Sequence, residues 1–329
     1  MKAKEVCGRF APSPSGRMHL GNLLCGLIAW LSVRSQNGKI ILRQEDLDEM
    51  RCPRSYAELI EQDLRWFGLD WDEGGLAGSG SHAPYLQSRR SEIYQQYLDK
   101  LNQKGLLYPC FCSRAQLHAA SAPHLEDGQV LYPGTCRHLT PEQIAQKRKT
   151  RPPALRVKVP DETVTFTDLH YGLVEQNLAT QCGDFILRRS DGVFAYQLAV
   201  TVDDGLMGVT QVIRGRDLLS STPRQIWLLR ELGFPVPEYG HIPLLLDETG
   251  NRLSKRDLSL DLGELRKRFG RPEPILGKLA YAAGLLDRPE PASARELIPV
   301  FSWEKIPKTD LYCPEGLRLE NSGNVHSLL

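Results

Sequence analysis

The chain lacks long apolar runs and has almost no excess of charge. Its longest apolar stretch, residues 23–33, includes a serine and is far shorter than the ~20 residues that span a bilayer. The chain starts with three charged residues among its first five and leads directly into an apolar segment, so no secretory leader is expected. A formal net charge of +1 means that a nucleic-acid partner would need a local basic patch. We expect a cytoplasmic protein without membrane attachment.

Internal repeats and low-complexity tracts are also missing, and cysteine is too sparse for a disulfide scaffold. The 329 residues are 41% hydrophobic and 25% charged, as in an ordinary globular protein, and are enough for about two domains of roughly 150 residues. Eight cysteines in such a chain indicate buried thiols or a metal site.

Strand-like and helical patterns alternate along most of the chain. Apolar runs at residues 6–10 and 39–42 alternate with helical periodicity at residues 55–67 and 91–101, and similar segments resume over residues 194–246. The alternation predicts an α/β fold with a doubly wound parallel sheet. The predicted division is a first half of the sheet domain at 1–108, an insertion at 109–195, the second half at 196–257 and a short helical region at 258–329.

A first chemical motif, Pro-Ser-Pro-Ser-Gly-Arg-Met-His-Leu-Gly-Asn, lies at residues 12–22 between a predicted strand and a predicted helix. A helix N-terminus offers N–H groups and a positive dipole end to phosphate. Gly21 permits close backbone approach, and His19 can stabilise charge that develops on a phosphate. Taken alone, the pattern more often marks a capped helix with an incidental histidine.

A second motif, Arg-Leu-Ser-Lys-Arg, lies at residues 252–256 in a polar segment. Lys255, preceded by Ser254, is a mobile cation that can meet a phosphate group in a transition state. A single lysine of this kind is usually solvated surface. The two motifs together, in this order, favour an ATP site.

Charged residues also follow two predicted strands. Residues 43–48 begin with Arg43 and include Glu45, and Arg214 follows another apolar run. The carboxyl ends of parallel strands line the crevice where such sheets bind ligands. Glu suits an ammonium group and Arg suits a carboxylate. The alternative is a set of polar loops whose charges pair among themselves.

Three cysteines form a candidate metal site. Cys110, Cys112 and Cys136 fall within 27 positions, with Tyr132 nearby, and three thiolates can bind zinc if a fourth ligand is supplied. The spacing alone leaves buried thiols an equal alternative. The other cysteines are expected to be small core or surface residues: Cys7, Cys25, Cys52, Cys182 and Cys313.

The two motifs resemble the HIGH and KMSKS signatures of class I aminoacyl-tRNA synthetases. Residues 9–16, 43–48, 214–225 and 252–256 are similar to the glutamyl branch of that family, over residues 6–257. The resemblance implies a Rossmann-type catalytic domain. It also implies that glutamate is held by the residues Arg9, Ser13, Glu45, Tyr196 and Arg214.

The resemblance further implies catalytic roles for His19 and Lys255 and the use of Mg²⁺ with ATP. It implies one structural Zn²⁺, because the branch uses a tyrosine as the unusual fourth ligand. Gln44 stands where the family usually has isoleucine, and Arg252 and Arg256 replace a lysine and a serine of KMSKS. The implied ATP-binding residues are His19, Gly21, Asn22, Ser254 and Lys255, and the implied zinc ligands are Cys110, Cys112, Tyr132 and Cys136.

Only 73 residues follow Arg256 in the chain of 329, too few for the helical part that reads the anticodon in full glutamyl-tRNA synthetases. This truncation resembles a stand-alone member of the branch that transfers glutamate to queuosine in the anticodon of tRNA(Asp). The expected partners are L-glutamate, ATP and queuosine-containing tRNA(Asp), and a monomer is expected.

Basic runs lie at residues 147–151 and 266–268. Such runs are typical of solvated helix faces. If they contact phosphates instead, they predict salt-sensitive binding.

Two alternatives remain at this point. One is a glutamyl-tRNA synthetase module that esterifies the tRNA 3′ end, with its anticodon-binding part on another chain. The other is a non-catalytic paralogue that binds tRNA or a nucleotide.

Overall fold

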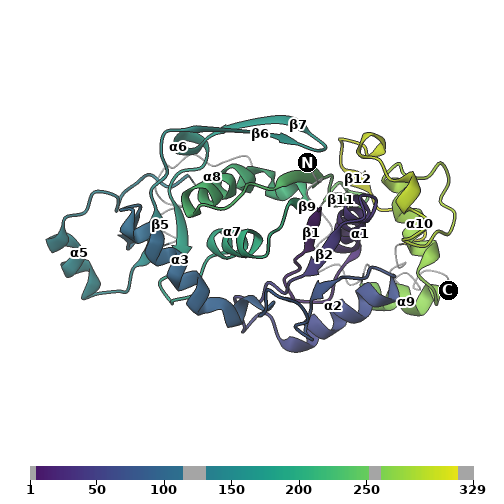
Figure 1. Ribbon diagram of the computed structural model, residues 1–329, viewed down its shortest axis with the longest axis horizontal. Coiled ribbons are helices and arrows are strands. Elements are labelled where there is room, and N and C mark those ends of the chain that lie inside the picture. The colour runs from purple at the N-terminus through teal and green to yellow at the C-terminus, as the bar shows by residue number, and fades with distance from the viewer. Residues whose placement is uncertain (1–4, 114–130, 252–260, 318–329) are drawn as a thin grey trace, which may run out of the picture.

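The computed structural model describes residues 5–113, 131–251 and 261–317, and its centre is a seven-stranded sheet in the order β3-β2-β1-β9-β10-β6-β7 (Figure 1). All neighbours pair in parallel except β7, which is antiparallel to β6. The strands are β1 Cys7–Phe10, β2 Lys39–Leu42, β3 Glu73–Gly74, β6 Thr163–Asp168, β7 Gly172–Asn177, β9 Gln211–Gly215 and β10 Glu238–Ile242. The doubly wound α/β prediction is therefore confirmed.

Helices cover both faces of this sheet, and alternate residues of each strand enter different cores. Ile40 and Leu42 of β2 pack in a core with the first helix, whereas Ile41 between them packs in a second core. The first core also contains side chains of α1, α2, α9 and α10, and the second those of α3, α7 and α8. These helices are α1 Leu20–Arg34, α2 Arg54–Trp66, α3 Ser91–Gln103, α7 Tyr196–Leu206, α8 Thr222–Leu232, α9 Leu262–Phe269 and α10 Glu273–Ala282.

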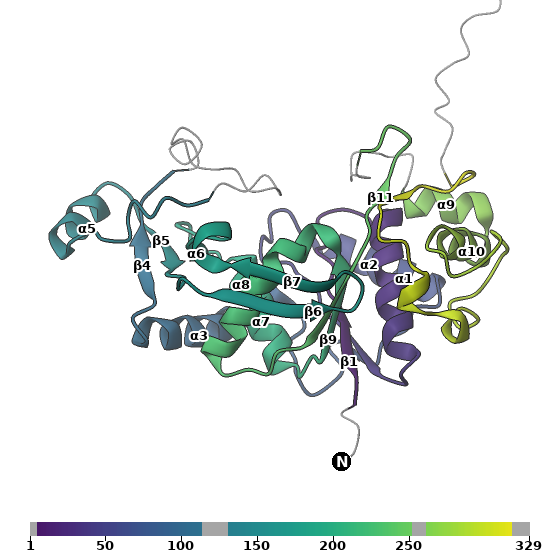
Figure 2. The same ribbon diagram turned by 90° about the horizontal axis from the view of Figure 1, so that it is seen from above.

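The segment predicted as an insertion, residues 109–195, contributes to two sheets. The antiparallel strands β4 Leu107–Cys110, β5 Ala154–Val157 and β8 Phe185–Arg188 form a separate small sheet. The hairpin β6–β7 instead extends the central sheet through β10. Helix α5, Pro141–Arg148, and the small sheet lie at one end of the molecule, opposite α9 and α10 (Figure 2).

The last described residues pack beside α1. Strand β12, Leu311–Tyr312, pairs with β11, Leu245–Leu246, and so returns the C-terminal region to the edge of the central domain. Side chains of α9 and α10 share the core of α1. Across the residues described, no helix has the length and apolar character needed to cross a membrane.

Gln44 is an isolated polar side chain in this packed interior. It is fully buried, and neither atom of its amide has a hydrogen-bond partner among the described residues. Because leaving a buried polar group unpaired costs ~1–3 kcal/mol, Gln44→Met is expected to raise the free energy of unfolding by about that amount. Urea denaturation measures it, with exposed Gln103 changed to Met as the control. Equal effects of the two changes would contradict the assignment.

Candidate active site and metal centre

A cleft opens where the order of the sheet reverses. From β1 the chain runs outward to β2 and β3 in one direction, and later to β9 and β10 in the other, so the carboxyl ends of β1 and β9 flank the crevice where such sheets bind ligands. The cleft has a volume of about 380 Å³, within the range for small-molecule sites. It brings together the predicted ATP and glutamate residues that the structure describes: Arg9, Ser13, His19, Gly21, Asn22, Glu45, Tyr196 and Arg214.

His19 caps the helix whose N-terminus faces the cleft. Its Nδ1 accepts a hydrogen bond of 3.1 Å from the Gly21 backbone N–H, and its own N–H donates to Asn22 Oδ1 at 3.2 Å. A Cβ at Gly21 would stand 3.0 Å from His19 Cε1, so glycine leaves room for the ring. Because Nδ1 is an acceptor, a neutral ring carries its proton on Nε2. The start of α1 therefore combines the Nε2–H donor of His19 with the positive end of the helix dipole.

The second predicted motif cannot be placed. Ser254 and Lys255, with Arg252 and Arg256, lie outside the described residues. The described chain resumes at Asp261, which forms an antiparallel bridge with His19. The segment after the lysine motif therefore returns to the same helix N-terminus.

Glu45 is held by a network of buried charges behind the cleft. Arg43, which is fully buried, pairs with Glu45 at 3.1 Å, with Asp204 at 2.7 Å and with Asp203 at 3.7 Å. Arg9 Nε donates to Asp204 at 3.4 Å. Burial raises the pKa of Glu45, and the charges of Arg43 and Arg9 offset only part of that shift. Glu45 is thus a carboxylate held in place by Arg43.

Arg214 lies at the other side of the cleft and has five hydrogen-bond acceptors. Shorter bonds join Nη1 to Gln225 Oε1 at 2.8 Å and Nη2 to Thr222 Oγ1 at 2.7 Å. Longer ones join Nη1 to the Tyr196 hydroxyl at 3.4 Å and Nη2 to the Leu218 carbonyl at 3.3 Å. The guanidinium plane is fixed by these partners.

The fifth acceptor of Arg214 is a histidine. Nε donates to His241 Nε2 at 3.1 Å, and His241 Nδ1 lies 2.6 Å from Asp168 Oδ2. Burial lowers the pKa of His241 to about 4, so the ring is neutral at pH 7 and its Nε2 accepts. Asp168, His241 and Arg214 therefore form a chain across three neighbouring strands, β6, β10 and β9.

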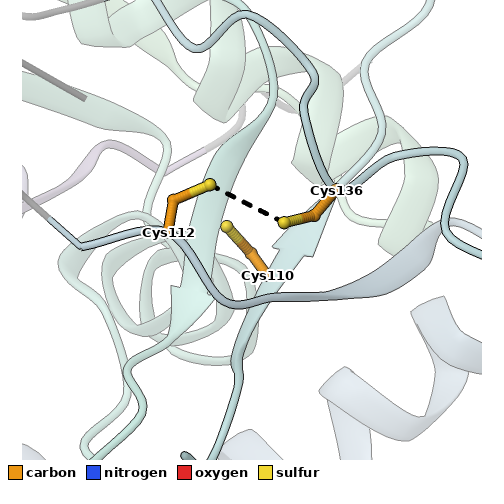
Figure 3. Close-up of side chains that lie close together, drawn as sticks. All are labelled: Cys110, Cys112 and Cys136. Atoms are coloured by element: carbon orange, nitrogen blue, oxygen red, sulfur yellow. Dashed lines mark hydrogen bonds between the residues drawn. The ribbon is translucent and has the colours of Figure 1, made fainter. Parts of the chain in front are cut away.

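The three predicted cysteine ligands lie together beside β4 (Figure 3). The sulfur atoms of Cys110, Cys112 and Cys136 all lie within 4.8 Å of one another, and Cys112 and Cys136 are 3.6 Å apart. The Tyr132 hydroxyl is 3.5 Å from Cys110 Sγ and 3.7 Å from Cys112 Sγ. This cluster can hold a metal ion.

Arg156, which the sequence analysis passed over, supports this cluster. Its Nε donates to Cys110 Sγ at 3.2 Å, and its guanidinium carbon stands 3.8 Å from the centre of the Tyr132 ring. Burial raises the pKa of the Cys110 thiol, but hydrogen bonds from Tyr132 and Arg156 and the charge of Arg156 lower it overall. A thiolate at Cys110 is therefore favoured.

The sequence patterns also did not single out the residues that hold the cleft side chains in place. The adjacent pair Asp203–Asp204 stands in an otherwise apolar helical stretch, and that pattern could have indicated buried ion pairs. Nothing local distinguishes Asp168 or His241. His118 and His124 lie between Cys112 and Tyr132 in the sequence and are further candidate ligands outside the described residues.

The fold and the cleft define a class I synthetase catalytic domain, and comparison with known proteins agrees. Residues 5–281 match the family model for the catalytic domain of class I tRNA synthetases (E and Q). The chain belongs to this family and is an ATP-dependent ligase. A solved structure of the glutamate-tRNA synthetase from Elizabethkingia anophelis is similar, with a TM-score of 0.79 and 28% identity, over 95% of this chain and 69% of that one.

Within this family, the relatives that match over nearly their full lengths share one name. The chain is 53% identical to the glutamyl-Q tRNA(Asp) synthetase of Symbiobacterium thermophilum, over 94% of this chain and 96% of that protein. It is 48% identical to the protein of the same name from Nitratidesulfovibrio vulgaris, over 95% and 97%. The glutamate–tRNA ligase of a Sulfurihydrogenibium species is 41% identical over 98% of this chain but 68% of its own length.

Proposed function

We propose that this protein activates L-glutamate with ATP in the absence of tRNA and then transfers the glutamate to queuosine in the anticodon of tRNA(Asp), in the cytoplasm. The observation that carries the proposal is the cleft at the sheet switch point, which unites a capped helix N-terminus with a carboxylate and two arginines. The acceptor is taken from the names of the relatives that match over nearly their full lengths.

Glutamate has one ammonium and two carboxylate groups, and the cleft offers groups of opposite charge to each. Glu45 suits the ammonium, and Ser13 also lines the cleft. Arg9 and Arg214 suit carboxylates. A carboxylate that binds Arg214 would replace its two longest hydrogen bonds, those to Tyr196 and Leu218.

Activation joins the glutamate α-carboxylate to the ATP α-phosphate, and pyrophosphate leaves. The N-terminus of α1 stabilises negative charge at the phosphates. The Nε2–H of His19 donates to an α-phosphate oxygen as its charge develops. Mg²⁺ supplied with ATP would screen the phosphates, and Lys255 is proposed to contact them. A queuosine hydroxyl then attacks the carbonyl of the adenylate, and AMP leaves.

The cysteine cluster is proposed to hold one structural Zn²⁺ through Cys110, Cys112, Tyr132 and Cys136. Tetrahedral zinc with usual bond lengths separates two sulfur ligands by about 3.8 Å and a sulfur from an oxygen ligand by about 3.5 Å. The observed separations are 3.6 Å between Cys112 and Cys136 and 3.5 Å between Cys110 and the Tyr132 oxygen. The Cys136 backbone N–H donates to the same oxygen at 2.8 Å and holds the Tyr132 hydroxyl beside the sulfur atoms.

Removal of ligands tests the metal site. Cys110→Ser is expected to abolish bound zinc, and Arg156→Met is expected to weaken zinc binding roughly 10- to 100-fold, because Arg156 balances the negative ligands. Competition with a chromophoric chelator measures the zinc affinity of each variant. Tyr132→Phe, compared with His118→Ala and His124→Ala, identifies the fourth ligand. Unchanged zinc affinity in Tyr132→Phe would contradict this ligand set.

The pKa of Glu45 predicts how glutamate binding varies with pH. Because burial raises that pKa, Glu45 becomes protonated at a higher pH than an ordinary glutamate, and the KM for glutamate is expected to rise as the pH falls through it. Above this pKa the KM should be flat. Glu45→Gln should give a high KM without that pH dependence, whereas parallel profiles of the two proteins would contradict the role of Glu45.

The activation step is tested by glutamate-dependent ATP–pyrophosphate exchange without tRNA. The proposal predicts exchange with L-glutamate and much less with L-glutamine or L-aspartate. No exchange with any of the three would contradict activation and favour a protein that binds tRNA or a nucleotide without catalysis.

A further inference from the structure

Three charged residues outside the ligand-binding set join the loop before α1 to helices α2 and α9. Asp63 of α2 is fully buried and accepts hydrogen bonds from Arg17 Nε at 3.0 Å, Arg17 Nη2 at 2.8 Å and Arg266 Nη1 at 2.8 Å. Arg17 lies two residues before His19, and Arg266 lies on α9. We propose that Arg17, Asp63 and Arg266 form a charged pin that positions the phosphate-binding loop against the start of α9 for the activation step.

Gly263, in the first turn of α9, leaves the space that the guanidinium of Arg17 occupies. A Cβ at Gly263 would stand 2.0 Å from Arg17 Nη1, so the arginine passes over the one residue of this turn without a side chain. Arg17 Nη1 also lies 3.8 Å from Asp261 Oδ1, which caps α9 through the Gly263 N–H at 2.7 Å. The same cap residue bridges to His19 through the backbone. Backbone and side-chain contacts thus join the loop that carries Arg17 and His19 to the start of α9.

The remaining member is held by an aromatic ring. The guanidinium carbon of Arg266 stands 5.2 Å from the centre of the Trp66 ring on α2, a favourable cation–π distance. Because one buried carboxylate serves two arginines from different parts of the chain, loss of either arginine leaves Asp63 less well compensated. The pin therefore couples the loop before α1 with α2 and α9.

The expected consequence concerns catalysis more than substrate binding. Asp261 follows Lys255 by six residues, so a fixed start of α9 restrains where the chain that carries Lys255, the proposed phosphate contact, rejoins the described residues. None of Arg17, Asp63 or Arg266 lines the cleft beside Arg9, Glu45 or Arg214. Arg17, Asp63 and Arg266 are thus positioning residues, and this role rests on the proposed function.

The test compares Gly263→Ala and Arg17→Gln with wild type. The alanine Cβ would stand 2.0 Å from Arg17 Nη1 and 2.7 Å from Asp261 Oδ1, so it displaces the pair formed by these two side chains without a change of charge. Both variants are expected to lower kcat of ATP–pyrophosphate exchange roughly 10- to 100-fold, as for a small misplacement of a catalytic group, while KM for glutamate stays within about twofold. Arg17→Lys should recover part of kcat, and Lys267→Ala on the exposed face of α9 should leave it unchanged.

Amide hydrogen exchange separates this proposal from the proposed function. In Gly263→Ala and Arg17→Gln, the amides of residues 21–23 and 264–266 should exchange faster together, whether or not glutamate is a substrate. Unchanged kcat in a folded variant, a KM for glutamate that rises as much as kcat falls, or opening of only one segment would each overturn the pin. Absence of exchange activity in wild type would contradict the proposed function, and the amide data would then decide the pin alone.

Discussion

His19→Ala is expected to lower kcat for glutamate-dependent ATP–pyrophosphate exchange by roughly 10²–10³-fold, the usual effect of removing one donor to a developing oxyanion. The expected KM for glutamate is unchanged, because Glu45, Arg9 and Arg214 lie on other elements of the cleft. Steady-state exchange kinetics measure both quantities.

The control separates catalysis from helix capping. His19 Nδ1 caps α1, and loss of a cap costs ~0.5–2 kcal/mol of stability. His19→Asn restores a cap acceptor, but its shorter amide places no donor at the position of Nε2–H. It should recover the thermal stability lost in His19→Ala without recovering exchange. If His19→Asn exchanges as fast as wild type, His19 is a capping residue only.

Arg43→Met is expected to lower the free energy of unfolding by about 3–5 kcal/mol, because it leaves buried carboxylates without their cation. Those carboxylates are Asp203, Asp204 and Glu45, which lie 3.7, 2.7 and 3.1 Å from the Arg43 guanidinium. Arg90 and Arg9 still pair with Asp203 and Asp204 in the variant, so Glu45 loses the most. KM for glutamate should rise in the folded fraction, because Glu45 loses its anchor. Denaturant unfolding and exchange kinetics measure these effects.

An exposed ion pair provides the comparison for Arg43. Arg54 and Glu58 are 3.2 Å apart on α2, with side chains 67% and 50% exposed. Arg54→Met should change stability by less than about 1 kcal/mol. A similarly small loss for Arg43→Met would show that the buried carboxylates do not depend on that charge.

The local features of the site could be predicted from sequence because neighbouring residues determine them. The helix expected after residue 22 begins at Leu20, and the strand expected at residues 39–42 is β2. His19 and Gly21 are two positions apart, and the capping bond between them is a local contact. The three cysteines predicted as metal ligands also lie together, with Cys110 at the end of β4 and Cys112 two residues later.

The supporting residues could not be predicted, because distant segments supply them. Asp168 and His241, which support the predicted Arg214, lie on β6 and β10, and the order of these strands and β9 in the sheet differs from their order in the chain. The hairpin β6–β7 lies within the segment predicted as an insertion, yet it pairs with β10. Strand partners of this kind depend on topology, which periodicity does not specify.

The most direct test of the central claim is the mass of the queuosine nucleoside. Queuosine-containing tRNA(Asp) is incubated with the protein, ATP and L-glutamate, digested to nucleosides and analysed by mass spectrometry, with tRNA(Asp) lacking queuosine in parallel. The proposal predicts that queuosine gains the mass of one glutamyl group and that the tRNA without it gains none. Glutamate found only on the 3′-terminal adenosine, with unmodified queuosine, would contradict the proposal and identify a glutamyl-tRNA synthetase module.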